Sequence, residues 1–584
     1  MLMSPPRNFY IYLLLSLFTL KAGAVPTLLA QDISGESEDL VGGAGTLIEQ
    51  PVRRQHRAHK EKPSASGSSA QSSQAQAENR ASRQTARAPK RKTADPAWRE
   101  TARSRDTTTR EPAGRTPAQP VRPEPDAAAY NAQGDQAFDA ADYAGAIEAY
   151  RQAVRLRPDY AEAYNSLGDS YFNLNRNEEA VAAYKQATTL KPDWDEPYGG
   201  LGDAYLNMGR ESEALEALRQ LARLRPDVSA AHYDLGAAYF RAARYREAVE
   251  SLKQAVRLDA QNAEAFNYLG QAYSSLGQYR EAAEYYQQLT RVKPESADAY
   301  FDLGVAQYNA GNYTAAVEAY KQVMRLNPNF SEVHSNLGDA YSKLSRYTEA
   351  ADVYKQAVSN KPNPQDYSNL GWAYSKTARF EEAVVAYRHA VRLKPDDGES
   401  YSNLGYALGK LRRWNESIDA LKQAIRLKAE TAEGYSNLGW AYNNMGRFSE
   451  ALDPLKQAIR LKADYAVAHF NLGITYSRLG QHANAVESFQ QAIRLKGDWP
   501  EAHNNMGYAL GSLGRWKDAI ASHREAVRLK ADYAGAYFNL GYAYLKSGDK
   551  KAAMEQYKIL QRINPALARK LYVLINNKLP PQTA

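Results

Sequence analysis

Apolar and polar positions repeat along most of this chain with a single period. A glycine, preceded by leucine in most copies, returns every 34 residues, except for a spacing of 33 between Gly338 and Gly371. Pro362 and Pro364 lie in that shorter interval and cannot both be inside a helix, so we expect a turn to absorb the deletion. Thirteen repeats result. Their marker glycines are Gly134, Gly168, Gly202, Gly236, Gly270, Gly304, Gly338, Gly371, Gly405, Gly439, Gly473, Gly507 and Gly541.

The pattern inside each repeat predicts two antiparallel helices. With the marker glycine counted as position 8, large apolar or aromatic residues recur at positions 4, 7, 11 and 24, and small residues at positions 8, 20 and 27. This 3.6-residue period, with small residues opposite large ones, is typical of helices whose backbones approach closely. Position 15 is glycine in seven repeats, including Gly446, which fits a left-handed residue that ends the first helix. The sequence therefore predicts an all-α protein.

These residues resemble the tetratricopeptide repeat (TPR), whose signature has an aromatic residue, Leu, Gly and Tyr followed by Ala, an aromatic residue, Ala and Pro at the same offsets. The resemblance covers residues 127–565, about three quarters of the chain. It implies a right-handed α-α superhelix of thirteen helix hairpins, with the first helices lining the inner face. Residues 566–584 are predicted to form a capping helix and a C-terminal tail. Because these residues are so few, we expect no catalytic domain of the kind that follows such repeats in O-linked N-acetylglucosamine transferases.

Position 6 is asparagine in each of the last seven repeats. An amide offers donors and an acceptor, so a row of amides can form hydrogen bonds with the main chain of an extended peptide whatever the sequence of the peptide. The row resembles the asparagine ladder in the repeat superhelix of O-linked N-acetylglucosamine transferases, which implies a ligand-binding role. The alternative is that asparagine at this position only reflects the general repeat consensus. The seven residues are Asn336, Asn369, Asn403, Asn437, Asn471, Asn505 and Asn539.

Positions 9 and 13 of the late repeats combine aromatic rings with cations. Such a stripe suits an extended ligand with side chains that stack and some negative charge. A second interpretation is that the aromatic residues pack between neighbouring repeats as core. The aromatic candidates are Trp372, Tyr406, Trp440, Tyr508 and Tyr542, and the cationic candidates are Lys376, Lys410, Arg478 and Lys546.

The first 126 residues differ from the repeats. Residues 1–24 contain a short basic start, the apolar run FYIYLLLSLFTL and the small-residue triplet at 22–24, which predict a signal peptide or, if it is not cleaved, an anchor. Residues 25–126 are rich in Ser, Gln, Arg and Pro and carry too few apolar residues to fold, so they are predicted to be a disordered tail. Residues 51–126 carry 17 Lys and Arg against 8 Asp and Glu. The tail is either a solvated linker or a segment that binds an anionic envelope polymer, and its lack of interleaved aromatic residues together with export disfavours nucleic acid.

No catalytic or metal-binding constellation is apparent. The chain has no cysteine, and its nine histidines do not cluster as metal ligands or bases. Hydrolase, phosphate-loop and dinucleotide motifs do not occur. We therefore predict no enzyme activity, no cofactor and no metal.

Two functions remain. The first is an exported, periplasmic or secreted scaffold of the bacterial envelope that binds extended protein segments and is anchored to the inner membrane if its leader is retained. The second is an envelope glycan or polymer binder that uses the aromatic groove and the basic tail.

Overall fold

The computed structural model describes residues 126–428 and 430–576, and these residues form helices joined by short turns. The leader, Ala429, the C-terminal tail and the N-terminal tail apart from Asp126 lie outside the described residues. The sequence places Asp126 in the predicted tail, but in the structure its carboxylate accepts a hydrogen bond from the Ala129 amide and caps the first described helix. No helix in the described part is both long and apolar enough to cross a membrane.

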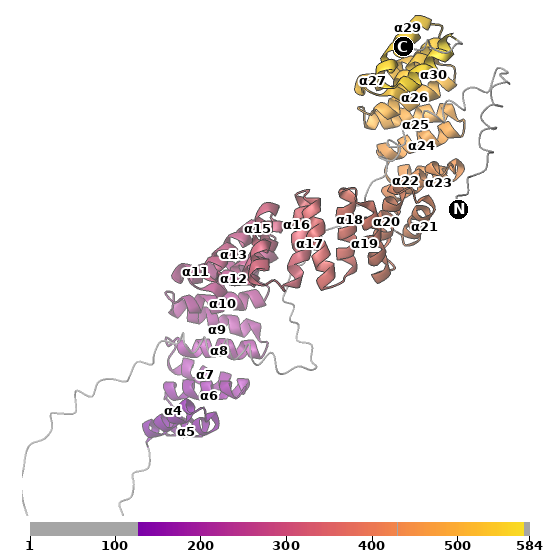
Figure 1. Cartoon of the computed structure of the whole chain (residues 1–584). Coiled ribbons are helices and arrows are strands. Elements are labelled where there is room, and N and C mark those ends of the chain that lie inside the picture. The colour runs from indigo at the N-terminus through magenta and orange to yellow at the C-terminus, as the bar shows by residue number, and fades with distance from the viewer. Residues whose placement is uncertain (1–125, 429, 577–584) are drawn as a thin grey trace, which may run out of the picture. The chain divides into compact units, whose positions relative to one another are not determined.

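Within the described residues the chain forms 27 helices, which divide into two compact blocks. Figure 1 draws these helices as coiled ribbons. The N-block contains repeats 1 and 2, and the C-block contains repeats 3 to 13 followed by α30 (Pro565–Asn576). In both blocks each repeat is one helix hairpin. The predicted all-α fold of stacked helix pairs is therefore confirmed.

The N-block has the first helices α4 (Ala127–Asp139) and α6 (Ala161–Asn173) and the second helices α5 (Tyr143–Leu156) and α7 (Asn177–Leu190). The first helices of the C-block are α8 (Glu196–Asn207), α10 (Ser229–Arg241), α12 (Ala263–Ser275), α14 (Ala297–Asn309), α16 (Ser331–Lys343), α18 (Pro364–Lys376), α20 (Gly398–Lys410), α22 (Ala432–Asn444), α24 (Ala466–Arg478), α26 (Pro500–Ser512) and α28 (Ala534–Lys546). Its second helices are α9 (Glu211–Leu224), α11 (Tyr245–Leu258), α13 (Tyr279–Val292), α15 (Tyr313–Leu326), α17 (Tyr347–Asn360), α19 (Phe380–Leu393), α21 (Trp414–Arg426), α23 (Phe448–Leu461), α25 (His482–Leu495), α27 (Trp516–Leu529) and α29 (Lys550–Ile563).

The marker glycine lets the two helices of a hairpin touch. A Cβ atom added at Gly439 would lie 2.4 Å from the side chain of Leu455 in the second helix. Ala451 and Ala458 of the same hairpin are fully buried. The close approach of the two helices is what the small residues at positions 8, 20 and 27 provide.

Position 15 adopts the left-handed conformation in all thirteen repeats, including the six in which it is not glycine. Gly446 has a φ angle of 71°, and Ala243 has a φ angle of 56°. A residue with a Cβ atom is strained there, whereas glycine is not. The turn geometry is therefore set by the repeat and not by the residue at position 15.

We expect Ala243→Gly to stabilise the C-block by about 0.5–1 kcal/mol, because glycine relieves the left-handed strain. Gly446→Ala is the matched control and should destabilise the C-block by a similar amount. Nothing lies within 4 Å of an added Cβ atom there, so only the energy of the left-handed backbone conformation changes. Urea unfolding followed by circular dichroism measures both values. Changes of the same sign in the two variants would contradict this account.

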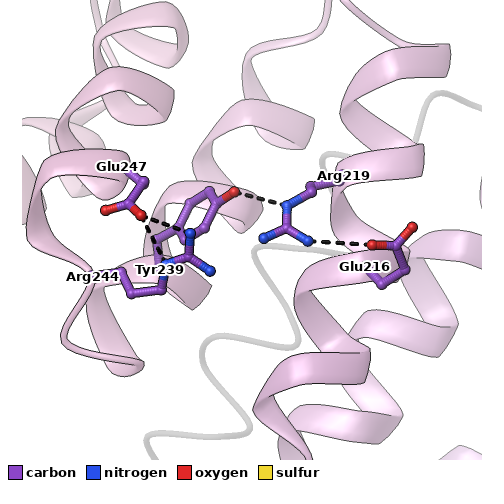
Figure 2. A network of polar contacts seen from close by, with 5 residues as sticks. All are labelled: Glu216, Arg219, Tyr239, Arg244 and Glu247. Carbon is purple, nitrogen blue, oxygen red and sulfur yellow. Dashed lines mark hydrogen bonds and ion pairs between the residues drawn. The ribbon is translucent and has the colours of Figure 1, made fainter.

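Tyrosine at position 11 joins neighbouring repeats on the side of the second helices (Figure 2). The Tyr239 hydroxyl accepts a hydrogen bond of 2.9 Å from Nε of Arg219, and the Arg244 guanidinium lies 4.9 Å from the centre of the Tyr239 ring. Arg219 and Arg244 also pair with Glu216 and Glu247, respectively. These arginines are thus part of the junction between repeats.

Candidate functional site

The aromatic residues at position 9 pack edge-on against rings of the preceding repeat. Trp440 lies 5.1 Å from Trp414 with an interplanar angle of 84°, and Trp372 lies 5.2 Å from Tyr347 at the same angle. Edge-to-face contact at this distance is the favoured arrangement of two aromatic rings. The same contact, with ring centres 6.1–6.4 Å apart, occurs in Phe380–Tyr406, His482–Tyr508 and Trp516–Tyr542.

Trp440 is a core residue, and the prediction that it presents its ring to a ligand is wrong for this structure. It is 1% exposed, and a Cβ atom added at Gly409 of the preceding first helix would lie 2.4 Å from its ring. The small residue at position 12 of one repeat thus makes room for the large residue at position 9 of the next. Trp372, Tyr406, Tyr508 and Tyr542 are only half-buried, so their ligand-binding role stays a prediction.

The asparagine row is mostly enclosed. Asn403, Asn437, Asn471 and Asn539 are buried, so these four line no open surface in this structure. Asn336, Asn369 and Asn505 are half-buried. The Asn369 amide donates to Asp339 over 3.3 Å, and the Asn539 amide donates to Asn504 over 3.0 Å. The sequence of a single repeat does not reveal that consecutive first helices pack closely. This packing is the reason why most of the asparagine row is buried and not open to a ligand.

The cations at position 13 do reach solvent. Lys376, Arg478 and Lys546 are exposed, and Lys410 is half-buried. The Lys376 ammonium lies 5.2 Å from the Trp372 ring centre, and the Lys546 ammonium lies 5.4 Å from the Tyr542 ring centre, so each pair is within cation–π distance. The accessible part of the candidate site is therefore this cation row, Lys376, Lys410, Arg478 and Lys546, with the edges of half-buried rings beside it.

Sequence reasoning missed a pairing between positions 9 and 24. The Tyr354 hydroxyl donates to Asp339 over 2.5 Å, and Tyr150 and Tyr184 of the N-block donate in the same way to Asp135 and Asp169. Burial raises the pKa of Asp339 to about 7. Where position 9 becomes Trp372, the buried Tyr387 hydroxyl has no partner among the described residues. The joint occurrence of Asp at position 9 and Tyr at position 24 was the available signal.

His523 also occupies position 24 and is a core residue. It is 2% exposed, lies against Gly507, and its Nδ1 is 3.0 Å from the Asn504 side-chain oxygen. Burial lowers the pKa of His523 to about 3. This imidazole is therefore neutral at physiological pH. Within the described residues no group of three His, Asp or Glu side chains is arranged to hold a metal.

Comparison with known proteins identifies the family. The sequence profile of the C-terminal domain of cilia and flagella-associated protein 70 matches residues 74–306 and 296–507. Tetratricopeptide-repeat profiles match residues 509–548 and 534–567. The profile of cilia and flagella-associated protein 70 covers more than half of the chain. The chain therefore belongs to the tetratricopeptide-repeat family. No curated protein matches the sequence.

Several solved structures are similar to the chain. A chain of the APC/C heterotetramer Cut9–Hcn1 is 15% identical, with 76% of this chain and 96% of that chain covered and a TM-score of 0.36. A chain of Naa15/Naa10 bound to HypK-THB is 15% identical, with 77% of each chain covered and a TM-score of 0.35. MamA is 28% identical, with 28% of this chain and 97% of that chain covered and a TM-score of 0.27. The family assignment rests on the sequence profiles.

Proposed function

We propose that this protein is a non-catalytic scaffold that binds an extended, acidic protein segment along the first helices of repeats 8 to 13. The cation row on α18, α20, α24 and α28, of which Lys376, Arg478 and Lys546 are exposed and Lys410 is half-buried, is the observation that carries the proposal. Proteins of this repeat family generally serve as protein-interaction scaffolds, which supports a protein partner.

The chemistry of the surface favours an acidic segment with aromatic or apolar side chains. Cations at position 13 of repeats 8, 9, 11 and 13 attract carboxylates, and half-buried rings next to them add apolar contact area. Sugar stacking is less well supported, because a sugar ring needs an open aromatic face. The half-buried rings pack edge-on against neighbours, and those of Trp372 and Tyr542 also lie beneath lysine ammonium groups. A protein segment therefore fits better than a glycan.

The setting that we propose is the bacterial cell envelope. The leader predicted over residues 1–24 would export the chain, and the basic tail would meet anionic envelope polymers. Fractionation of cells expressing the full-length protein, followed by N-terminal sequencing, tests both export and cleavage.

Charge reversal of the cation row should weaken binding of a fluorescein-labelled peptide of about twelve alternating Glu and Tyr residues. We expect the full-length variant K376E/K410E/R478E/K546E to bind this peptide roughly 10-fold to 100-fold more weakly in fluorescence anisotropy, because four attractive charges become repulsive.

The matched control is R392E/R426E/R460E/R494E, which changes the net charge equally at exposed positions of the second helices and retains the basic tail. It should bind within about threefold of the unmodified protein. An equal loss of affinity in both variants would show that peptide binding depends only on the net charge of the protein. It would exclude the cation row as the binding surface.

A further inference from the structure

Two carboxylates from consecutive repeats meet at the junction between repeats 7 and 8. Asp339 lies at position 9 of α16, and the Asn369 amide of α18 donates a hydrogen bond of 3.3 Å to its carboxylate. Asp366 precedes Asn369 by three residues, so both side chains lie on the same face of α18. Asp366 is 5% exposed and Asp339 is half-buried. The junction therefore holds two acids where water cannot fully screen their repulsion.

Among the thirteen repeats the sequence provides this acid pair once. Position 3 is charged only at Asp366 and is Ala, Pro, Val, Ser or Gly in the other repeats, so every other aspartate at position 9 precedes a repeat with an uncharged position 3. Asp366 follows the shortened interval and shares a reciprocal cap with Asn363 at the start of α18. The Asp366 amide donates to the Asn363 side-chain oxygen over 3.0 Å, and the Asn363 amide donates to the Asp366 carboxylate. This cap orients the Asp366 side chain.

The surroundings of Asp339 disfavour its negative charge. The titratable groups that face Asp339 come from five helices and are Tyr308 of α14, Tyr320 of α15, Lys343 of α16, Tyr354 of α17 and Asp366 of α18. Lys343 is the one cation in this set, and it is exposed. The Tyr354 hydroxyl donates to the Asp339 carboxylate over 2.5 Å and stabilises its charge. Burial, together with the charge of Asp366, outweighs this hydrogen bond and raises the pKa of Asp339 to about 7.

We propose that Asp339 and Asp366 form a proton-dependent joint between repeats 7 and 8, in which uptake of one proton by Asp339 stabilises the contact between α16 and α18 and its release destabilises this contact. A protonated Asp339 is not repelled by Asp366 and keeps an acceptor for the Tyr354 hydroxyl. An ionised Asp339 gains hydration when the junction opens. Because α18 carries Trp372 and Lys376, the joint lies where the candidate site begins. The joint itself is independent of the proposed function.

The direction of the pH dependence follows from the closed and open states of the junction. In the open state Asp339 is hydrated and has the ordinary aspartate pKa of about 3.9. Between this value and the raised pKa of about 7, the closed junction binds a proton that the open junction does not bind. The closed state is therefore most stable in mild acid and loses stability as the pH rises to about 7. At higher pH both states are ionised, so the stability of the junction levels off.

Hydrogen exchange of the amides in α16 and α18, corrected for intrinsic rates, tests the joint in the full-length protein. Between pH 5 and pH 8 we expect protection to fall by roughly tenfold or more. Asp339→Asn keeps the size of the side chain and an acceptor for Tyr354 but does not titrate, so this fall should disappear. Asp352→Asn removes a charge from an exposed position of α17 and should leave the fall unchanged. Equal pH profiles for Asp339→Asn and the unmodified protein would overturn the proposal.

Two further variants distinguish a titrating joint from a purely structural contact. Asp366→Asn removes the neighbouring charge and should lower the pH at which protection levels off, by about one pH unit. Tyr354→Phe removes a hydrogen bond to the charged form of Asp339 and should raise that pH. A loss of packing alone would reduce protection at every pH without moving this point. The opposite shifts test the joint even if Asp339→Asn does not fold, and an unchanged levelling point in both variants would overturn the proposal.

Discussion

Trp440→Ala should destabilise the C-block by about 3–5 kcal/mol, the range for removal of a buried large aromatic side chain. The indole is enclosed by Gly409 of the preceding first helix, by Trp414 at 5.1 Å and by Tyr406 at 6.4 Å, so its removal leaves a cavity that repeats 9 and 10 share. Urea unfolding followed by circular dichroism measures the loss. Trp372→Ala should cost less, because Trp372 is only half-buried.

A double-mutant cycle with Gly409 tests the specific contact. Gly409→Ala places a methyl group 2.4 Å from a carbon atom of the Trp440 ring and should destabilise the unmodified protein. In the Trp440→Ala background the same methyl group enters the cavity, so its cost should disappear or reverse. Additive effects of the two substitutions would contradict the close packing of positions 12 and 9.

Much of the fold was predictable because it depends on contacts inside one hairpin. The 34-residue period identifies both helices, and the pairing of Gly439 with Leu455 follows from small and large residues at fixed positions. The left-handed turn at position 15 was also evident, since glycine occurs there in seven repeats. Each of these features repeats along the chain, so thirteen copies support one interpretation.

The candidate site was harder to predict because it depends on contacts between repeats. An aromatic residue at position 9 can face a ligand or fill a gap, and the choice depends on position 12 of the preceding repeat. Gly409 makes that gap for Trp440, whereas Asp339 at position 9 instead accepts a hydrogen bond from Tyr354. Whether an aromatic residue at position 9 is buried can therefore be predicted by comparing it with position 12 of the preceding repeat.

The C-terminal repeats should lose stability in mild acid because of His523. The unfolded chain has the ordinary histidine pKa of about 6.5, whereas burial lowers the pKa of His523 in the folded protein to about 3. Below pH 6.5 the unfolded state binds a proton that the folded state does not bind, so the free energy of unfolding falls with decreasing pH. Above pH 6.5 protonation of His523 does not change the free energy of unfolding. Below pH 6.5 this free energy falls by about 1.4 kcal/mol per pH unit, which is about 2 kcal/mol at pH 5.

The variant His523→Leu isolates this effect, because other carboxylates and histidines titrate equally in both proteins. Leucine occupies position 24 at Leu421 and Leu455, where it packs against the marker glycine, and the Asn504 side-chain oxygen retains its hydrogen bond from Asn539. Hydrogen exchange of the amides in α26 to α29 between pH 7 and pH 5, corrected for intrinsic rates, should therefore show a smaller loss of protection in His523→Leu than in the unmodified protein. Phe489→Leu makes a comparable apolar change at the same position of the preceding repeat and should leave the pH dependence unchanged. Parallel pH profiles for the unmodified protein and His523→Leu would mean that burial of His523 does not couple protonation to unfolding.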